Sequence, residues 1–248
     1  MLTQPVALDV REHARWRLRP QRGFPFAAGL HMASVMQPEF RRVSVIYPIV
    51  FVEDTEFDAF RPMALFGLKA GENLFVEPDG RWDASYVPAV VRAYPFALAR
   101  AADGDRLAVC IDASEQAVSP THGVPLFEDD GQPSAALRDA KAFLARLRQM
   151  QVLTDAFCRA LAERNLFTPF AVRARRGGEI VEVDGCYVID EERLDRLSDA
   201  RLSGLRERGW LAAVYAHLVS LLQLDRLSHG PSGDLAARSP MASPGVHR

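Results

Sequence analysis

Cysteine is scarce in this sequence of 248 residues, which limits the redox and metal chemistry that the chain can carry. The three cysteines, Cys110, Cys158 and Cys186, are widely spaced and odd in number. They predict neither a disulfide framework nor a pair of zinc ligands, and each is expected to be a small buried apolar residue. This usage suits a reducing compartment, so we expect a cytoplasmic protein.

A long apolar run is also lacking. The stretch from Gly209 to Leu224 carries no formal charge, but it contains His217, Ser220 and Gln223. It is shorter than the roughly 18 apolar residues that a membrane span needs, so a buried core helix is the better interpretation. The first 22 residues have no apolar core of the kind found in signal peptides. We therefore expect no transmembrane segment.

The chain has little net charge. Its 30 Lys and Arg and 32 Asp and Glu residues leave a formal charge of −2, which provides no basic field for nucleic acid. Five arginines do fall between Arg11 and Arg22. A solvated first strand beginning near His13 is favoured there, and a basic arm that touches an anionic partner stays open as the alternative.

Recognisable catalytic and metal-binding motifs are missing, among them the nucleophile elbow, the HExxH helix and the kinase motifs. The acidic trio at 128–130 lacks EF-hand spacing, so we expect no metal and no cofactor. Arg173, Arg175 and Arg176 lie beside two glycines and could hold an anion, although an exposed turn is favoured. An enzyme is not excluded, because active sites assemble from distant positions.

The stretch from Tyr47 to Ala99 organises the rest of the chain. The apolar run Val43–Val52 predicts a buried strand with a bulge or an edge near Pro48. Further predicted elements are strands over Pro62–Leu68 and Leu74–Val76, a turn at Pro78–Gly80 with Trp82 on the return strand, a short helix opening near Pro88, and strands over Phe96–Leu98 and Leu107–Ile111 joined at Asp103–Asp105.

Helices and a hairpin follow this stretch. After a long connection from Ser114 to Pro133, the apolar spacing predicts a helix from Ser134 to Asn165. Further predicted elements are a hairpin of Leu166–Ala174 and Glu179–Ile189 whose second arm could fold again at Asp184–Gly185, helices over 190–197 and 198–208, and a last helix over Trp210–Leu227.

These elements predict an α+β fold with a central, mainly antiparallel sheet, packed by a long helix and closed by a C-terminal helical cap. We expect residues 1–229 to form a single domain. Residues 230–248 are rich in Gly, Pro, Ser and Ala and have little to bury, so we expect a disordered tail.

A ligand pocket, if there is one, should lie in the central stretch. Aromatic walls with one or two arginines suit a peptide, an aromatic acid or a carboxylate, although the same residues could simply close the core. The candidate ligand-binding residues are Tyr47, Arg61, Trp82, Tyr86, Arg92 and Tyr94.

His217 is the one candidate catalytic residue. It shares a helical apolar stripe with Trp210, Val214, Leu221 and Leu224. A buried histidine needs a hydrogen-bond partner, which would be a backbone group in a structural role or a carboxylate in a catalytic one. The structural role is favoured.

Several short blocks of the chain resemble the SapC family of bacterial proteins. They are YPIVF (47–51), ALFGL (64–68), GENLFV (71–76), DGRWDASYVPA (79–89) and YPF (94–96), together with Glu39-Phe40 upstream and the helix from Gly209 to Leu218 downstream. The resemblance covers roughly residues 13–228 and departs from the family at Met36-Gln37-Pro38. It implies no catalytic residue.

Three functions stay open. The resemblance implies a non-catalytic accessory or binding protein, linked to surface-layer or export-related processes, with a protein or peptide partner. An enzyme acting on a small molecule or peptide would need His217 to meet an acidic partner in a cavity. A peptide-binding module would need an uncovered strand beside the connection from Ser114 to Pro133.

Overall fold

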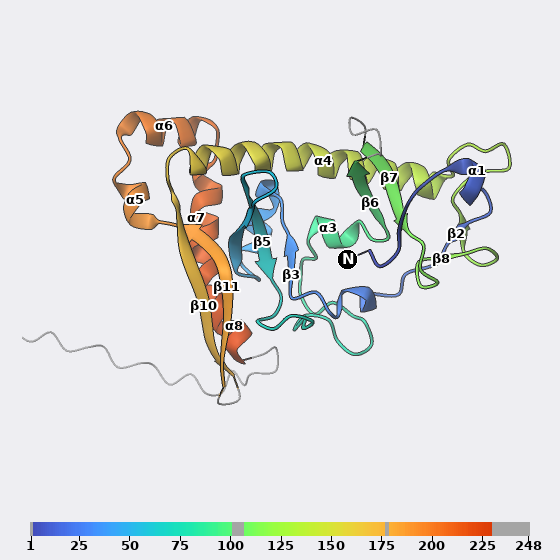
Figure 1. Ribbon diagram of the computed structural model, residues 1–248, viewed down its shortest axis with the longest axis horizontal. Helices are drawn as coiled ribbons and strands as arrows, with labels where there is room; N and C mark the ends of the chain where they lie inside the picture. Colours follow the sequence, from blue (N-terminus) through green and yellow to red (C-terminus); the bar gives the residue numbers. More distant parts are fainter. Residues whose placement is uncertain (1, 101–106, 177–178, 230–248) are drawn as a thin grey trace, which may run out of the picture.

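The computed structural model describes residues 2–100, 107–176 and 179–229 (Figure 1). The predicted tail from residue 230 onward lies outside the described residues. So do the predicted turn at Asp103–Asp105 and the two glycines of the arginine-rich turn, Gly177 and Gly178.

The described strands form three antiparallel sheets, with orders β1-β7-β6, β10-β11-β4-β5-β3 and β8-β2-β9. The strands are β1 (Pro5–Ala7), β2 (Arg17–Leu18), β3 (Met32–Ser34), β4 (Ile49–Asp54), β5 (Ala59–Leu65), β6 (Phe96–Arg100), β7 (Leu107–Asp112), β8 (Val118–Ser119), β9 (Val124–Pro125), β10 (Phe167–Arg176) and β11 (Glu179–Ile189). The predicted α+β class is confirmed, with the strands divided among three sheets.

The helices lie mostly in the second half of the chain. They are α1 (Val10–His13), α2 (Phe40–Val43), α3 (Ala89–Arg92), α4 (Ala135–Ala162), α5 (Glu191–Asp195), α6 (Asp199–Glu207), α7 (Leu211–Ser220) and α8 (Leu224–His229), with 3-10 turns η1 (Pro25–Ala27), η2 (Gln37–Glu39) and η3 (Leu221–Gln223). In the described part of the chain, no helix combines the length and the apolar character needed to cross a bilayer.

The long helix α4 extends over two of the three sheets. Its 28 residues extend about 42 Å, and Figure 1 shows it running along the top of both the five-stranded sheet and the β1-β7-β6 sheet. Ser134 caps its first turn by accepting a hydrogen bond from the Leu137 N–H, as the sequence predicts. Asn165, at φ +53°, lies just beyond its end.

Two hydrophobic clusters lie beneath α4. The first packs Phe157 and Leu161 of the C-terminal half of α4 with the five-stranded sheet and with α7. The second packs Leu137 and Leu144 of the N-terminal half with the β6–β7 pair. Phe26 contacts both clusters, so the chain entering the fold bridges them.

The strand predicted over Val43–Val52 begins only at Ile49. Residues 40–43 form α2 instead, and the N–H of Tyr47 donates to the Val43 carbonyl at 2.8 Å. Pro48 has no N–H to give a ladder, so the strand starts directly after it. The first half of the predicted strand is therefore wrong, and Pro48 directly precedes β4, an inner strand that pairs with β11 and β5, so it does not lie at a sheet edge.

Two other predicted strands are corrected. The strand predicted to begin near His13 is reduced to the two-residue β2, and residues 10–13 before it are helical, because the Asp9 side chain caps α1 by accepting from the Arg11 N–H. Leu74–Val76 makes only one isolated bridge, Val76 to Trp82. There the Asn73 side chain accepts from the Phe75 N–H, which replaces a ladder bond.

The C-terminal third matches its prediction with two changes. The strand β11 does not fold again at Asp184–Gly185; Gly185, at φ +73°, lies at an irregularity in the pairing between Phe170 and Val172. The last predicted helix is divided by η3 into α7 and α8.

The connection from Ser114 to Pro133 also contains two short strands, β8 and β9, which pair with β2.

Candidate functional site

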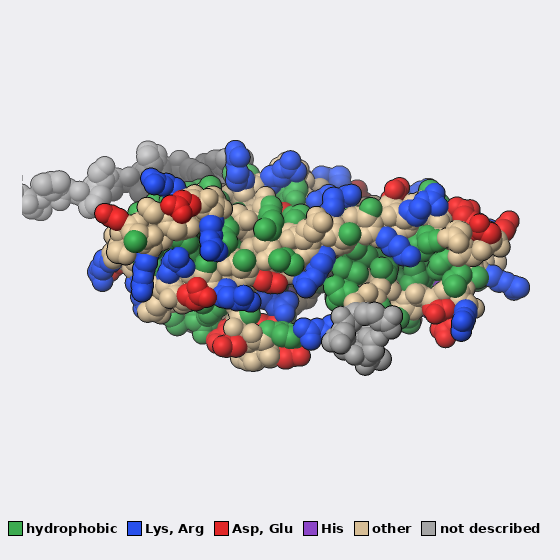
Figure 2. Space-filling view, turned by 90° about the horizontal axis from the view of Figure 1, so that it is seen from above, with side chains coloured by type: hydrophobic (Ala, Val, Ile, Leu, Met, Phe, Trp, Pro, Cys, Tyr) green, Lys and Arg blue, Asp and Glu red, His purple; other side chains and the backbone are tan. Residues whose placement is uncertain are grey.

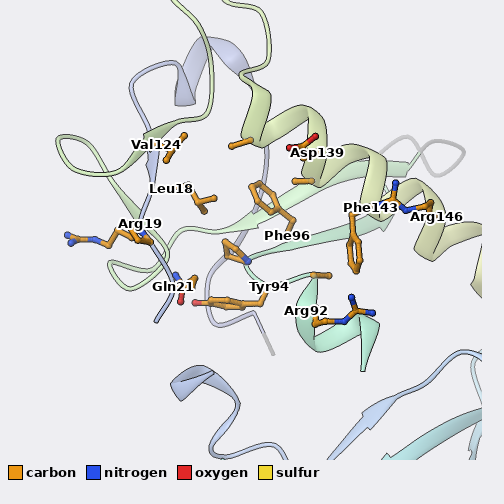
Figure 3. Close-up of a pocket in the computed structure, with 15 residues that line it drawn as sticks. Leu18, Arg19, Gln21, Arg92, Tyr94, Phe96, Val124, Asp139, Phe143 and Arg146 are labelled. Atoms are coloured by element: carbon orange, nitrogen blue, oxygen red, sulfur yellow. The ribbon is translucent and has the colours of Figure 1, made fainter. Parts of the chain in front are cut away.

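A hollow of about 510 Å³ lies between the first half of α4 and the segment that links α3 to β6 (Figure 3). We call it the α4 groove. Its lining residues are Leu18, Arg19, Pro20, Gln21, Arg92, Ala93, Tyr94, Pro95, Phe96, Val124, Ala136, Asp139, Ala140, Phe143 and Arg146. Its volume lies in the range of small-molecule sites, roughly 300 to 1,000 Å³.

Aromatic rings form much of the wall of the α4 groove. Tyr94 stacks on Phe26 with ring centroids 3.7 Å apart and an interplanar angle of 13°. Burial raises the pKa of Tyr94 above its ordinary value, so its hydroxyl is protonated at neutral pH. Figure 3 shows Phe96 at the centre of the hollow and Phe143 descending into it from α4.

Two arginines flank Phe143. The guanidinium carbons of Arg92 and Arg146 lie 5.5 Å and 5.8 Å from the centroid of the Phe143 ring. Neither forms an ion pair with a carboxylate among the residues that the structure describes. Arg19 points away from these two in Figure 3, while Asp139 is the one acidic residue of the lining. The groove therefore presents a local positive charge.

A chain of hydrogen bonds connects Arg92 to the core. The indole N–H of Trp82 donates to the Tyr47 hydroxyl at 2.7 Å, and that hydroxyl donates to the Tyr86 carbonyl at 2.7 Å. Arg92 donates through Nη2 to the Tyr86 hydroxyl at 3.4 Å and through Nε to the Val87 carbonyl at 3.0 Å. These bonds fix the direction of the Arg92 side chain.

Glu39 anchors the other end of this chain. Its buried carboxylate accepts from the Met36 N–H at 2.9 Å, the Ala89 N–H at 2.8 Å and the Tyr86 hydroxyl at 2.6 Å. Burial and the bond to Glu39 raise the pKa of Tyr86 to about 12. Three donors satisfy the buried negative charge, so Glu39 holds α3 and Tyr86 in place.

The predicted ligand-binding residues therefore separate into groups. Arg92 and Tyr94 line the α4 groove, and Tyr86 supports Arg92. Tyr47 and Trp82 are buried in the core, where burial raises the pKa of Tyr47 above its ordinary range. Arg61 lies elsewhere, in an ion pair with Asp54 and over the Phe57 ring.

His217 lies in the core and does not line the α4 groove. Its Nε2 accepts a hydrogen bond from the Ile189 N–H at 3.0 Å, so the neutral ring carries its proton on Nδ1. Burial lowers its pKa to about 3, an effect that the Ile49 backbone only partly opposes. Among the described residues, no carboxylate forms a hydrogen bond or ion pair with this ring.

A smaller hollow of about 290 Å³ shares Gln21, Arg92 and Tyr94 with the α4 groove. Phe24 and Phe26 also line it, so the aromatic character continues past Tyr94. Over the described residues, no three His, Cys, Asp or Glu side chains are grouped as metal ligands. The chemistry offered at both hollows is that of guanidinium groups beside aromatic rings.

The candidate residues predicted from the sequence do not include Phe143 and Arg146, because the apolar spacing of their region predicts a helix and no site. Their spacing of three places them on neighbouring positions of α4, which is a usable signal. Prediction from the sequence also missed the anchoring role of Glu39, although the pair Glu39-Phe40 stands out in the sequence.

The fold and the groove define an α+β protein with a positively charged, aromatic-lined hollow beneath a long helix. A family model, SapC, matches residues 8–227, so the chain belongs to the SapC family. No curated protein and no solved structure matches it.

Proposed function

We propose that this protein binds, without transforming it, a ligand that carries a negatively charged group and an apolar or aromatic part. The observation that carries the proposal is that the guanidinium carbons of Arg92 and Arg146 lie 5.5 Å and 5.8 Å from the centroid of the Phe143 ring in the α4 groove. The negatively charged group of the ligand would bind at these guanidinium groups, and the rest of the ligand would contact Tyr94 and Phe96.

Electrostatics support an anionic ligand. The whole chain has a formal charge of −2, but three arginines and one aspartate line the α4 groove. Guanidinium groups form strong, directional hydrogen bonds to carboxylates and phosphates. Arg92 is oriented by two existing bonds, so less conformational freedom is lost when it binds a ligand.

The wider role that we propose is that of an accessory or binding protein, acting in the cytoplasm and linked to surface-layer or export-related processes. Only the family resemblance supports this link. An enzyme using His217 has less support, because this ring is buried, lacks a carboxylate partner among the described residues and does not line the groove.

Native mass spectrometry of the protein purified from its own cells tests the binding function. We expect an added mass on the wild-type chain that is lost in Arg146→Gln. Arg159→Gln is the matched control, because it removes the same charge from the exposed side of α4 outside the groove. A bare wild-type chain, or an added mass retained by Arg146→Gln, would overturn the proposal.

A further inference from the structure

The strand β6 has one free edge. It is the last strand in the order β1-β7-β6, and its register pairs Ala97 with Cys110 and Leu98 with Val109. The Asp112 N–H donates to the Pro95 carbonyl, so Ala97 and Ala99 exchange ladder bonds with β7. The N–H and carbonyl of Leu98 therefore point away from β7.

These two backbone groups have no hydrogen-bond partner among the described residues. Leu98 is only half-exposed, and a strand edge with unpaired N–H and carbonyl groups is a template for another strand. The Phe96 N–H is already bonded to the Ala93 carbonyl at 2.8 Å, which fixes where an added strand could begin to pair.

A third hollow, of about 220 Å³, lies along β6, between this strand, α3 and α4. We call it the β6 cleft. Leu98, Leu107, Leu144 and Leu147 contribute to its apolar wall, and Arg148 and Gln151 stand at its polar side. Leu107 is 46% exposed, so part of this apolar wall is open to solvent.

The molecular surface is also apolar in the region of β6. Figure 2 shows hydrophobic side chains gathered in the right half of the face seen from above, where Figure 1 places the N-terminal half of α4 with β6 and β7. Elsewhere on this face, basic and acidic side chains are interspersed. An apolar surface beside a free strand edge has the two components that bind an extended chain.

We propose that β6 accepts an extended peptide segment as an added strand. The main chain of the peptide pairs with Leu98, its alternate apolar side chains enter the β6 cleft, and an acidic side chain faces Arg148. Arg148 is exposed and has no carboxylate partner within the described ranges, which gives the acidic residue its complement. A small molecule would leave the edge unpaired.

This site does not depend on the ligand of the α4 groove. The α4 groove and the β6 cleft share Ala93 and Phe96, but Arg92 and Arg146 do not line the β6 cleft. Arg146→Gln should therefore leave peptide binding unchanged. Failure of one proposal is in this way distinguishable from failure of the other.

Selection from a random heptapeptide library on the full-length protein provides the probe. We expect enriched peptides to alternate apolar residues and to carry an acidic residue. Methylation of the one peptide N–H that pairs with Leu98 should weaken binding about tenfold or more, because it removes a single main-chain donor. Hydrogen exchange of the Leu98 amide should slow by a similar factor in the complex.

Two variants control this result. Arg148→Glu should weaken binding of the selected peptides about tenfold, whereas Arg159→Glu on the same helix should not change it. The proposal is overturned if no peptide is enriched, if every methylated peptide binds as well as its parent, or if exchange at Leu98 is unaffected by the peptide.

Discussion

Acidification should destabilise this protein through His217, and the structure gives the size of the effect. The pKa of this ring lies near 3 in the folded chain and near 6.5 when exposed, so the unfolded state binds the proton more readily. Stability is therefore full above about pH 6.5 and falls as the pH drops toward 3. Linkage gives a loss of about 2 kcal/mol between pH 7 and pH 5 from this residue alone.

The structural reason is the position of the ring. Its Nε2 accepts from the Ile189 N–H, and its ring centroid lies 5.0 Å from that of Phe51. Protonation would break the bond from Ile189 and place a charge in the core. Next to it, Ser220 accepts from the Ile49 N–H at 2.9 Å, so α7 uses two buried polar side chains to satisfy the ends of β11 and β4.

Urea unfolding at pH 7 and pH 5 measures the effect, with His217→Gln as the comparison. A glutamine carbonyl can still accept from Ile189 but does not titrate. We expect the variant to be less stable at pH 7 by about 1 to 3 kcal/mol, and to lose about 2 kcal/mol less than the wild type on going to pH 5. The other histidines are common to both chains and cancel. Equal losses in both proteins would refute the reasoning.

Two further predictions concern the N-terminal half. Asp112 accepts hydrogen bonds from the N–H groups of Thr3 and Gln4. Burial by itself raises the pKa of the Asp112 carboxyl, but these and other hydrogen bonds have the larger combined effect, so its pKa lies below the ordinary value. Asp112→Asn should cost about 1 to 3 kcal/mol and expose β1 to proteolysis; an unchanged cleavage pattern would contradict this anchor. Gly123 has φ +117°, and an added Cβ would clash with the Leu18 carbonyl. Gly123→Ala should lower stability by about 1 to 3 kcal/mol and Gly71→Ala, which has open space, by less; equal melting temperatures would argue against the clash.

The elements that the sequence predicts best are those with local signals. The helix α4 has a serine cap, a sustained apolar stripe and an asparagine just after its end. Each of these signals comes from residues that are close together in the sequence. The β6–β7 pair likewise follows from two apolar runs around a turn. Such elements depend little on distant contacts.

Residues 40–54 show a limit of prediction from local sequence patterns. An apolar, β-branched run predicts a strand, but the Glu39 carboxylate bonds to Met36 and Ala89, and this holds the chain in a turn until Pro48. The hydrogen bond from the Ala89 N–H to the Glu39 carboxylate spans 50 positions in the sequence. A contact of that range cannot be found from the spacing of apolar residues.

Long-range contacts also decide which of the predicted site residues line the α4 groove. Tyr47, Trp82 and Tyr86 do form one hydrogen-bonded chain, but only its end at Arg92 reaches the α4 groove. The opposite wall comes from Phe143 and Arg146, on a helix that follows a long connection. Composition can identify residues suited to a pocket, whereas tertiary packing decides which of them line it.

Binding of a carboxylate in the α4 groove is the central claim, and a titration monitored by amide NMR tests it most directly. Small aryl carboxylates and their matched amides would be added to the wild type, Arg146→Gln and Arg159→Gln. We expect the carboxylates to shift the amide signals of residues 92–96 and 143–146, and to bind about tenfold tighter than the amides. Arg146→Gln should abolish that preference and Arg159→Gln should keep it. Equal binding of carboxylates and amides by the wild type would show that the groove does not bind the carboxylate group.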